Sequence, residues 1–346
     1  MSKKVSMKRI ATELGVSVAL VSYVLNGKMT NRINEDTAKR ILALAEKLNY
    51  RPNQIAKSLK NSKTYTMGLI VADISNFFYS HLARYIEEEA NAHGYNLIFG
   101  SAYEDPKRFE NILHILIARQ VDGLILAVPE GAEHSISYLK EIEIPFVLID
   151  REFPEFEKII TINLDNFKSS KSVVSHFLSQ GFKRLGAVGL STHLHHLQER
   201  KRGFIETASA NLPADAVHSY DIAEGELSEK IEETITAAIH RDKLDAICFF
   251  TNKIAMAALP VIVKMNLRVP DDIAIVCFDE AEAYKLFSCP LSYVRQPLQT
   301  MSNLAVNYLT DNEQHLRGNH IKFDSDLVVN RSSIHPSSES MRRRVE

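Results

Sequence analysis

The sequence contains few cysteines and no long apolar run, and both absences limit the class of protein. Its three cysteines, Cys248, Cys277 and Cys289, are widely spaced and form no CxxC pair. We expect small buried thiols in a reducing cytosol rather than a disulfide framework. No segment reaches the roughly 20 apolar residues of a transmembrane helix, and MSKKVSMKRI lacks the apolar core and cleavage site of a signal peptide. The sequence therefore predicts a cytoplasmic protein with no membrane partner.

Motifs that carry catalysis or hold a metal are also missing. No GxGxxG or GxxxxGK[ST] motif follows an apolar run, no GxSxG presents a serine, and no HExxH is present. His193, His195 and His196 lie together in THLHHLQER, but no carboxylate or cysteine stands at a metal-ligand spacing from them. We therefore expect no catalytic residue, no metal and no cofactor, and we interpret the histidine segment as a surface loop near a ligand-binding cleft.

Length and composition are those of a globular protein, but the charge is unevenly distributed. The 346 residues are 45% hydrophobic and 24% charged, which allows two or three folded units. Residues 1–65 hold 13 Lys or Arg and 4 Asp or Glu, whereas the remainder holds 28 and 39. A basic head on an acidic body suggests contact with a polyanion, although charge alone fits a solvated basic face equally well.

The basic head is predicted to contain three short helices. The first covers residues 7–14, with Ser6 as its N-cap and Gly15 after its end. Ser17 can cap a second helix two residues later, and Asn34 can cap a third. The first two elements therefore have the spacing of a helix, a tight turn and a helix.

The second helix, VALVSYVL, is apolar because a small domain must bury one of its faces. A helical period of about 3.6 residues places Val21, Val24 and Leu25 on one side. These residues are expected to pack on apolar stripes of the first and third helices, namely Ile10, Leu14, Ala38, Ile41, Leu42, Ala45 and Leu48. The uncharged outward face suits a helix in a DNA major groove, although a protein-interaction module has the same geometry.

Two long stretches resemble the DNA-binding headpiece of the lactose-repressor (LacI/GalR) family. They are SMKRIATELGVSVALVSYVLNGK and INEDTAKRILALAEKLNYRPNQIAKSL. The resemblance implies a recognition helix that includes Ser17, Val18, Ala19, Ser22 and Tyr23. It also implies phosphate or positioning contacts with double-stranded DNA from Met7, Asn26, Arg32, Asn34, Thr37, Tyr50 and Asn53.

Two features of the head depart from the family pattern. Many members have arginine at the position of Tyr23, so the bidentate contact to guanine is missing and the operator sequence should differ. The loop GKMTNR, which contains Arg32, is longer than in the lactose repressor itself.

The segment RPNQIAKSLKNSKTYT links the head to the body. Asn53 can cap a helix over residues 54–60, which is too short to be stable alone. In the resembling family such hinge helices pair and enter the minor groove, which makes Ala56 and Leu59 candidate DNA contacts, with Leu59 wedged between base pairs. A plain linker that docks on the body is the alternative.

From Met67 onward, apolar runs alternate with amphipathic segments such as residues 82–93. The runs are MGLIVADI, NLIFGS, VDGLILAV, PFVLID, RLGAVGL, DAICFFT and DIAIVCFD. Such runs predict parallel strands covered on both faces in a repeated β-α-β arrangement. Residues 67–333 resemble the periplasmic-binding-protein-like effector domain of the same family, which implies two doubly wound α/β subdomains around a cleft.

Polar residues that follow the predicted strands are candidate contacts for a carbohydrate effector, because ligands of open parallel sheets bind at the carboxyl ends of strands. The family resemblance matches six positions to effector contacts: Asn76, Phe78, Asp150, Arg200, Asn252 and Asp279. Carboxylates and amides can pair with sugar hydroxyls, and an aromatic ring can pack on the apolar face of a sugar. Lys253 stands where many members have aspartate, and it would admit a phosphorylated or acidic sugar unless it points to solvent.

We therefore expect a helix-turn-helix DNA-binding domain (1–51), a hinge helix and linker (52–66), an effector-binding and dimerisation domain (67–335) and a polar tail (336–346). The tail lacks the leucine heptads of a tetramer-forming coil, which favours a homodimer on a palindromic operator. The resemblance implies a repressor of carbohydrate-utilisation genes that responds to a sugar or sugar phosphate. Control by a protein corepressor, or a carbohydrate-binding protein whose head contacts another protein, remain as alternatives.

Overall fold

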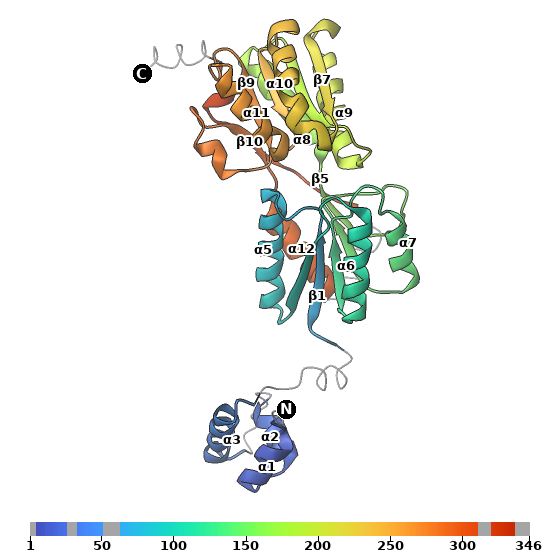
Figure 1. Cartoon of the computed structure of the whole chain (residues 1–346), viewed down its shortest axis with the longest axis vertical. Coiled ribbons are helices and arrows are strands. Elements are labelled where there is room, and N and C mark those ends of the chain that lie inside the picture. The colour runs from blue at the N-terminus through green and yellow to red at the C-terminus, as the bar shows by residue number, and fades with distance from the viewer. Residues whose placement is uncertain (1–4, 26–32, 51–62, 311–319, 336–346) are drawn as a thin grey trace. The chain divides into compact units, whose positions relative to one another are not determined.

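A computed structural model describes the protein over residues 5–25, 33–50, 63–310 and 320–335 (Figure 1). The chain divides into two compact units, Met1–Thr64 and Tyr65–Glu346. No helix in these described ranges is long and apolar enough to cross a membrane. The predicted hinge helix and the polar tail lie outside the described residues, as do the predicted DNA contacts Asn26, Arg32, Asn53, Ala56 and Leu59.

The described part of the first unit contains three helices, α1 (Met7–Leu14), α2 (Val18–Leu25) and α3 (Glu35–Lys47). Ser6 caps α1, and Gly15 ends that helix in the left-handed conformation at a φ of 65°. The Oγ of Ser17 accepts a hydrogen bond from the amide of Leu20 at 3.1 Å, and the Oδ1 of Asn34 accepts one from the amide of Asp36 at 2.8 Å. The predicted helix boundaries and caps are confirmed.

The three helices share a small apolar core formed by Ile10, Val21, Val24 and Ile41. The prediction was wrong for Leu42, which is 43% exposed. Each residue advances about 100° around a helix, so a side chain next to the fully buried Ile41 turns toward solvent. Leu44 takes its place against the core.

The described part of the second unit alternates strands and helices (Figure 1). Its first half contains β1 (Thr66–Val71), α5 (Phe77–Ala92), β2 (Asn96–Ser101), α6 (Pro106–Ala118), β3 (Gly123–Leu126), α7 (His134–Glu141), β4 (Phe146–Ile149) and β5 (Thr161–Leu164). Its second half contains α8 (Asn166–Gln180), β6 (Leu185–Leu190), α9 (His195–Ser209), β7 (Val217–Ile222), α10 (Leu227–Thr236), β8 (Ala246–Phe249), α11 (Asn252–Lys264), β9 (Ala274–Phe278) and β10 (Ser292–Arg295). It ends with α12 (Leu298–Thr310), β11 (His320–Phe323) and β12 (Asp326–Val328).

These strands form two six-stranded sheets with matching orders, β11-β5-β4-β3-β1-β2 and β12-β10-β9-β8-β6-β7. All pairings are parallel except that of the edge strand β12 with β10. The two halves therefore repeat one doubly wound fold, and the predicted fold class is confirmed. We call them the first subdomain, with β1 to β5, and the second subdomain, with β6 to β10.

Helices cover both faces of each sheet, which is why inner strands such as β1, β3, β8 and β9 are almost entirely apolar and buried. In the first subdomain α5 and α12 contribute to one core cluster, and α6 and α7 to the other. In the second, α10 and α11 lie on one face and α8 and α9 on the other. Cys248 and Cys277 lie in β8 and β9, and burial raises the pKa of both thiols, which agrees with the expected small buried side chains.

Three connections between the subdomains fall within the described residues. The chain leaves the first sheet after β5 to enter α8, returns after β10 to α12, and leaves again between β11 and β12. The first and third connections lie side by side, because the amide of Asp165 donates to the carbonyl of Phe323 at 2.8 Å. A few short connections of this kind allow the two subdomains to change their relative angle as rigid bodies.

Candidate functional site

The predicted recognition face of α2 is accessible on the first unit. Val18 and Tyr23 are 44% and 53% exposed, Ser17 and Ala19 are exposed, and Ser22 is half-buried. The opposite face holds the buried Val21 and Val24, so the two-faced helix expected from its sequence is present. The exposed face presents small, apolar and hydroxyl groups without a charge.

Among the other predicted DNA contacts, Met7, Thr37 and Tyr50 are half-buried and Asn34 is exposed. The Oδ1 of Asn34 caps α3, so the predicted phosphate contact would have to use its amide nitrogen. Tyr50 packs against the core of the three helices, and burial raises the pKa of its hydroxyl. It therefore remains an uncharged hydroxyl group beside the core.

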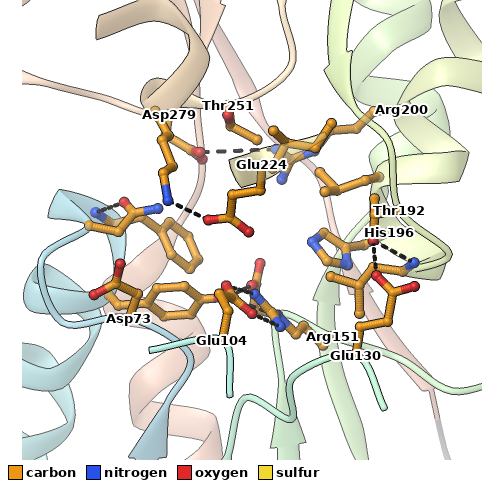
Figure 2. A pocket seen from close by; sticks show the side chains of 18 of the residues that line it. Asp73, Glu104, Glu130, Arg151, Thr192, His196, Arg200, Glu224, Thr251 and Asp279 are labelled. Carbon is orange, nitrogen blue, oxygen red and sulfur yellow. Dashed lines mark hydrogen bonds and ion pairs between the residues drawn. The ribbon is translucent and has the colours of Figure 1, made fainter. Parts of the chain in front are cut away.

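In the second unit, a cavity of about 240 Å³ lies between the carboxyl ends of the strands of the two subdomains (Figure 2). Of the six predicted effector contacts, five line it: Asn76, Phe78, Asp150, Arg200 and Asp279. Figure 2 shows the side chains of Arg200, Glu224 and Asp279 on one side of this cavity and those of Glu104 and Arg151 on the other. We call it the cleft.

Asn252, the sixth residue, is buried next to the cleft rather than in its lining. Its Nδ2 donates to the Oδ1 of Asn76 at 3.0 Å, which joins the two subdomains. The same Oδ1 accepts from the amide of Phe78 at 2.9 Å and caps α5. Because of this cap, α5 begins at Phe77, five residues before the start expected from the sequence.

Asp150 and Asp279 occupy equivalent positions, directly after β4 and β9. Both are buried and adopt the left-handed backbone conformation, with φ of 68° and 65°. Tyr79 donates its hydroxyl to Asp150 at 2.7 Å, and Gln296 donates its amide to Asp279 at 2.6 Å. Burial raises the pKa of both carboxyl groups, and the neighbouring arginines oppose that rise.

Two buried arginines face these carboxylates. Arg151 donates to both oxygens of Glu104, at 2.5 and 2.8 Å, and to the hydroxyl of Tyr79 at 3.0 Å. Arg200 donates through Nε to Asn166 at 2.7 Å and through Nη1 to the carbonyl of Phe250 at 2.6 Å. These bonds fix both guanidinium planes before any ligand arrives.

The histidine segment agrees only in part with the expected surface loop near the cleft: His193 is exposed in a loop, whereas α9 begins at His195. His196 lies in the first turn of α9, is 5% exposed and lines the cleft. Burial, followed by the nearby charges of Arg151 and Arg200, lowers the pKa of His196 well below its usual value, so the ring is neutral at physiological pH. Its spacing of four residues from Arg200 puts both on one helical face, a signal that the sequence contained.

Several of the described contacts hold the two subdomains together across the cleft. Thr192 and the amide of His193 donate to Glu130 at 2.5 and 3.1 Å. The Nδ1 of His195 forms a hydrogen bond with the Oε1 of the buried Glu152 at 2.8 Å. These contacts, together with that between Asn76 and Asn252, stabilise the present angle between the subdomains.

Known proteins match both units of the chain. Residues 6–53 match the family described as bacterial regulatory proteins, lacI family, and residues 174–334 match the periplasmic binding protein-like domain. The transcriptional repressor PurR of Aliivibrio salmonicida is 30% identical over 339 residues, covering 95% of this chain and 99% of PurR. The chain belongs to the LacI family. It is a DNA-binding transcriptional regulator, and the resemblance seen in the sequence is confirmed.

Solved structures show the same fold as this LacI-family chain. The lac repressor dimer bound to operator and the anti-inducer ONPF has a TM-score of 0.81 at 20% identity, covering 96% of this chain and all of that one. The transcriptional regulator CelR in complex with cellobiose has a TM-score of 0.67 at 21% identity, covering 95% and 99%. Both comparisons agree with the headpiece and the repeated α/β subdomains described above.

Proposed function

We propose that this LacI-family regulator is a homodimeric repressor that binds a palindromic operator and responds to a sugar in the cleft. The observation that carries the sugar hypothesis is the composition of the cleft. Buried carboxylates, an arginine and an aromatic ring from both subdomains meet in one cavity, as a polyhydroxylated ligand requires. The complex of CelR with cellobiose, a protein of the same fold, supports this proposal.

The exposed face of α2 supports direct contact with bases. Val18 and Ala19 can contact thymine methyl groups, and the hydroxyl of Tyr23 can bond to a base edge. The protein that matches this chain at a TM-score of 0.81 is a dimer bound to its operator, which supports the same mode of binding here.

Exposed apolar residues on the second unit support a dimer. The edge strand β2 pairs only with β1 among the described strands and carries Phe99, which is 56% exposed. In the second subdomain, Leu286 is 88% exposed, and Met256 is also exposed. Apolar side chains at a sheet edge favour association with another chain.

A ligand that contacts both subdomains can couple the cleft to the DNA. Such a ligand stabilises the angle between the subdomains at which it contacts both of them. It can change the affinity of the protein for DNA only to the extent that the ligand itself binds more tightly at one angle than at another. Arg200 and Asp279 from the second subdomain and Asp150 from the first provide such contacts.

Selection of the full-length protein against randomised duplexes tests the DNA-binding part. Enrichment of a palindrome is expected, whereas enrichment of single half-sites would contradict the dimer. The enriched duplex then serves as a fluorescent probe for a panel of sugars. A sugar that changes operator affinity supports the proposal, and its effect should be lost in Arg200→Ala. If no sugar changes operator affinity, control by a protein corepressor becomes the better hypothesis.

A further inference from the structure

We propose that the cleft selects uncharged or positively charged polyhydroxylated ligands, meaning neutral or amino sugars, and rejects phosphorylated and carboxylated ones. This inference rests on the proposed function, because it specifies the class of ligand for the same cavity. Of the two alternatives that the sequence left open for Lys253, it rejects the one in which this residue admits an acidic sugar.

The described lining of the cleft contains more carboxylates than cations. Six carboxylates line it: Asp73, Glu104, Glu130, Asp150, Glu224 and Asp279. Three permanent cations line it: Arg151, Arg200 and Lys253. His196 adds no charge, because burial keeps its ring neutral. A ligand therefore enters a cavity with an excess of negative charge.

Each of the three cations already faces a carboxylate. Arg151 forms its ion pair with Glu104 at 2.5 Å, and Arg200 lies 4.0 Å from Asp279.

Lys253 forms an ion pair with Glu224, so the positive charge added at this position is compensated within the protein. Asp150 has no direct ion pair but is faced by Arg151 and Arg200, whereas Asp73 and Glu130 form no ion pair with any lysine or arginine that the structure describes. The uncompensated charge of the cleft is thus entirely negative.

One buried acceptor of the lining also calls for a ligand that donates. Two buried atoms in the lining have no partner among the described residues: the Oε1 of Gln296, which can only accept, and the Nδ1 of the neutral His196, which donates or accepts according to the tautomer. The amide of Gln296 is oriented by its hydrogen bond to Asp279 at 2.6 Å, so its Oε1 remains as an acceptor. Sugar hydroxyls and ammonium groups can donate to this oxygen and to the carboxylates. A phosphate dianion offers only acceptors.

The free energy of transfer from water also disfavours a phosphate ester in this cavity. A phosphate monoester carries about −1.5 to −2 charges near neutral pH. Its transfer from water into a cavity with unpaired carboxylates loses hydration without gaining a free cation, which is unfavourable. An ammonium group in the same place gains a carboxylate partner.

The test measures ligand affinity of the full-length protein by calorimetry for matched sets of sugars. The sets contain neutral pentoses, hexoses and disaccharides, their amino derivatives, and their phosphate monoesters at a primary hydroxyl. For every parent sugar that binds, we expect the phosphate ester to bind at least about tenfold more weakly, because like charges across an interior site are strongly disfavoured. The amino derivative should bind as well as the parent or more tightly.

Two results would overturn the inference. One is a phosphate ester that binds more tightly than its parent, which would leave the proposed function intact if that ester also changes operator affinity. The other is the absence of binding by every neutral and amino sugar at tens of millimolar. If the phosphate esters also fail to bind, the sugar effector in the proposed function is wrong as well.

A pair of variants tests the role of Lys253 directly. Glu224→Gln removes the partner of Lys253 at a partly exposed position and should improve the affinity of a phosphate ester relative to its parent by about tenfold. Glu226→Gln is the matched control, because Glu226 lies on the same short turn, pairs with Lys230 and does not line the cleft. An unchanged ratio in Glu224→Gln, or an equal change in the control, would refute the compensation of Lys253 by Glu224.

Discussion

The hydroxyl of Tyr79 joins two charged groups of the cleft, and its removal should cost a predictable part of the stability. It donates to Asp150 at 2.7 Å and accepts from the Nε of Arg151 at 3.0 Å. Tyr79→Phe keeps the buried ring and deletes both hydrogen bonds. Hydrogen bonds to charged groups contribute about 1.5 to 3 kcal/mol each, so we expect a loss of about 3 kcal/mol after partial relaxation.

The loss of stability in Tyr79→Phe should also depend on pH, and the pKa of Asp150 determines in which direction. Burial raises the pKa of Asp150 in the folded protein, and the hydrogen bond from Tyr79 opposes that rise. Without this hydrogen bond, the Asp150 carboxyl of the folded variant keeps its proton to a higher pH. The variant therefore loses stability as the pH rises from the usual aspartate pKa of 3.8 through the raised pKa of Asp150. The deficit of Tyr79→Phe should therefore be larger at neutral pH than in acid.

Urea unfolding of the full-length protein measures both effects. Tyr103→Phe is a suitable control, because Tyr103 is exposed and its substitution should change the free energy of unfolding by less than about 0.5 kcal/mol. A deficit for Tyr79→Phe as small as that of the control would refute the argument. So would a deficit that grows on acidification.

Three further predictions concern DNA binding, coupling and acid stability. Leu59→Ala should weaken operator binding while leaving sugar affinity unchanged, and fluorescence anisotropy with an unchanged operator affinity would contradict the minor-groove wedge. Glu152→Gln removes the carboxylate that pairs with His195 across the cleft, so sugar affinity measured by calorimetry should fall several-fold although Glu152 does not line the cavity. Asp242→Asn should cost the most stability above the usual aspartate pKa of 3.8, and progressively less below it. Hydrogen bonding to Arg241 lowers the pKa of Asp242 to about 2, so thermal unfolding should show the difference vanish as pH falls through that value.

The sequence could predict those parts of the fold that depend on local signals. Ser6, Gly15 and Asn34 are helix caps, and their positions alone define the ends of α1 and the start of α3. Asp150 and Asp279 could be placed at a common site because each follows an apolar strand. In both cases the structure of a residue depends on residues that are adjacent to it in the sequence.

Partners that are distant in the sequence could not be predicted. Arg151 pairs with Glu104, 47 positions away, and Lys253 with Glu224, 29 positions away. Neither pairing follows from a periodicity, because it depends on which loops meet above the two sheets. For this reason Lys253 was expected to add positive charge to the cleft, whereas the folded chain compensates it.

The repeated architecture explains how a small ligand can act on the whole regulator. Each subdomain contributes one buried aspartate from the same position of the same fold, so a ligand that bonds to Asp150 and Asp279 must sense the angle between the two sheets. The contacts of Glu130 with Thr192 and of Glu152 with His195 already stabilise one angle without a ligand. Weakening them lowers the population of that angle, which reduces apparent ligand affinity but increases the change that the ligand produces. If the proposed function is correct, the strength of these protein contacts sets the balance between sensitivity to the ligand and the size of the response at the operator.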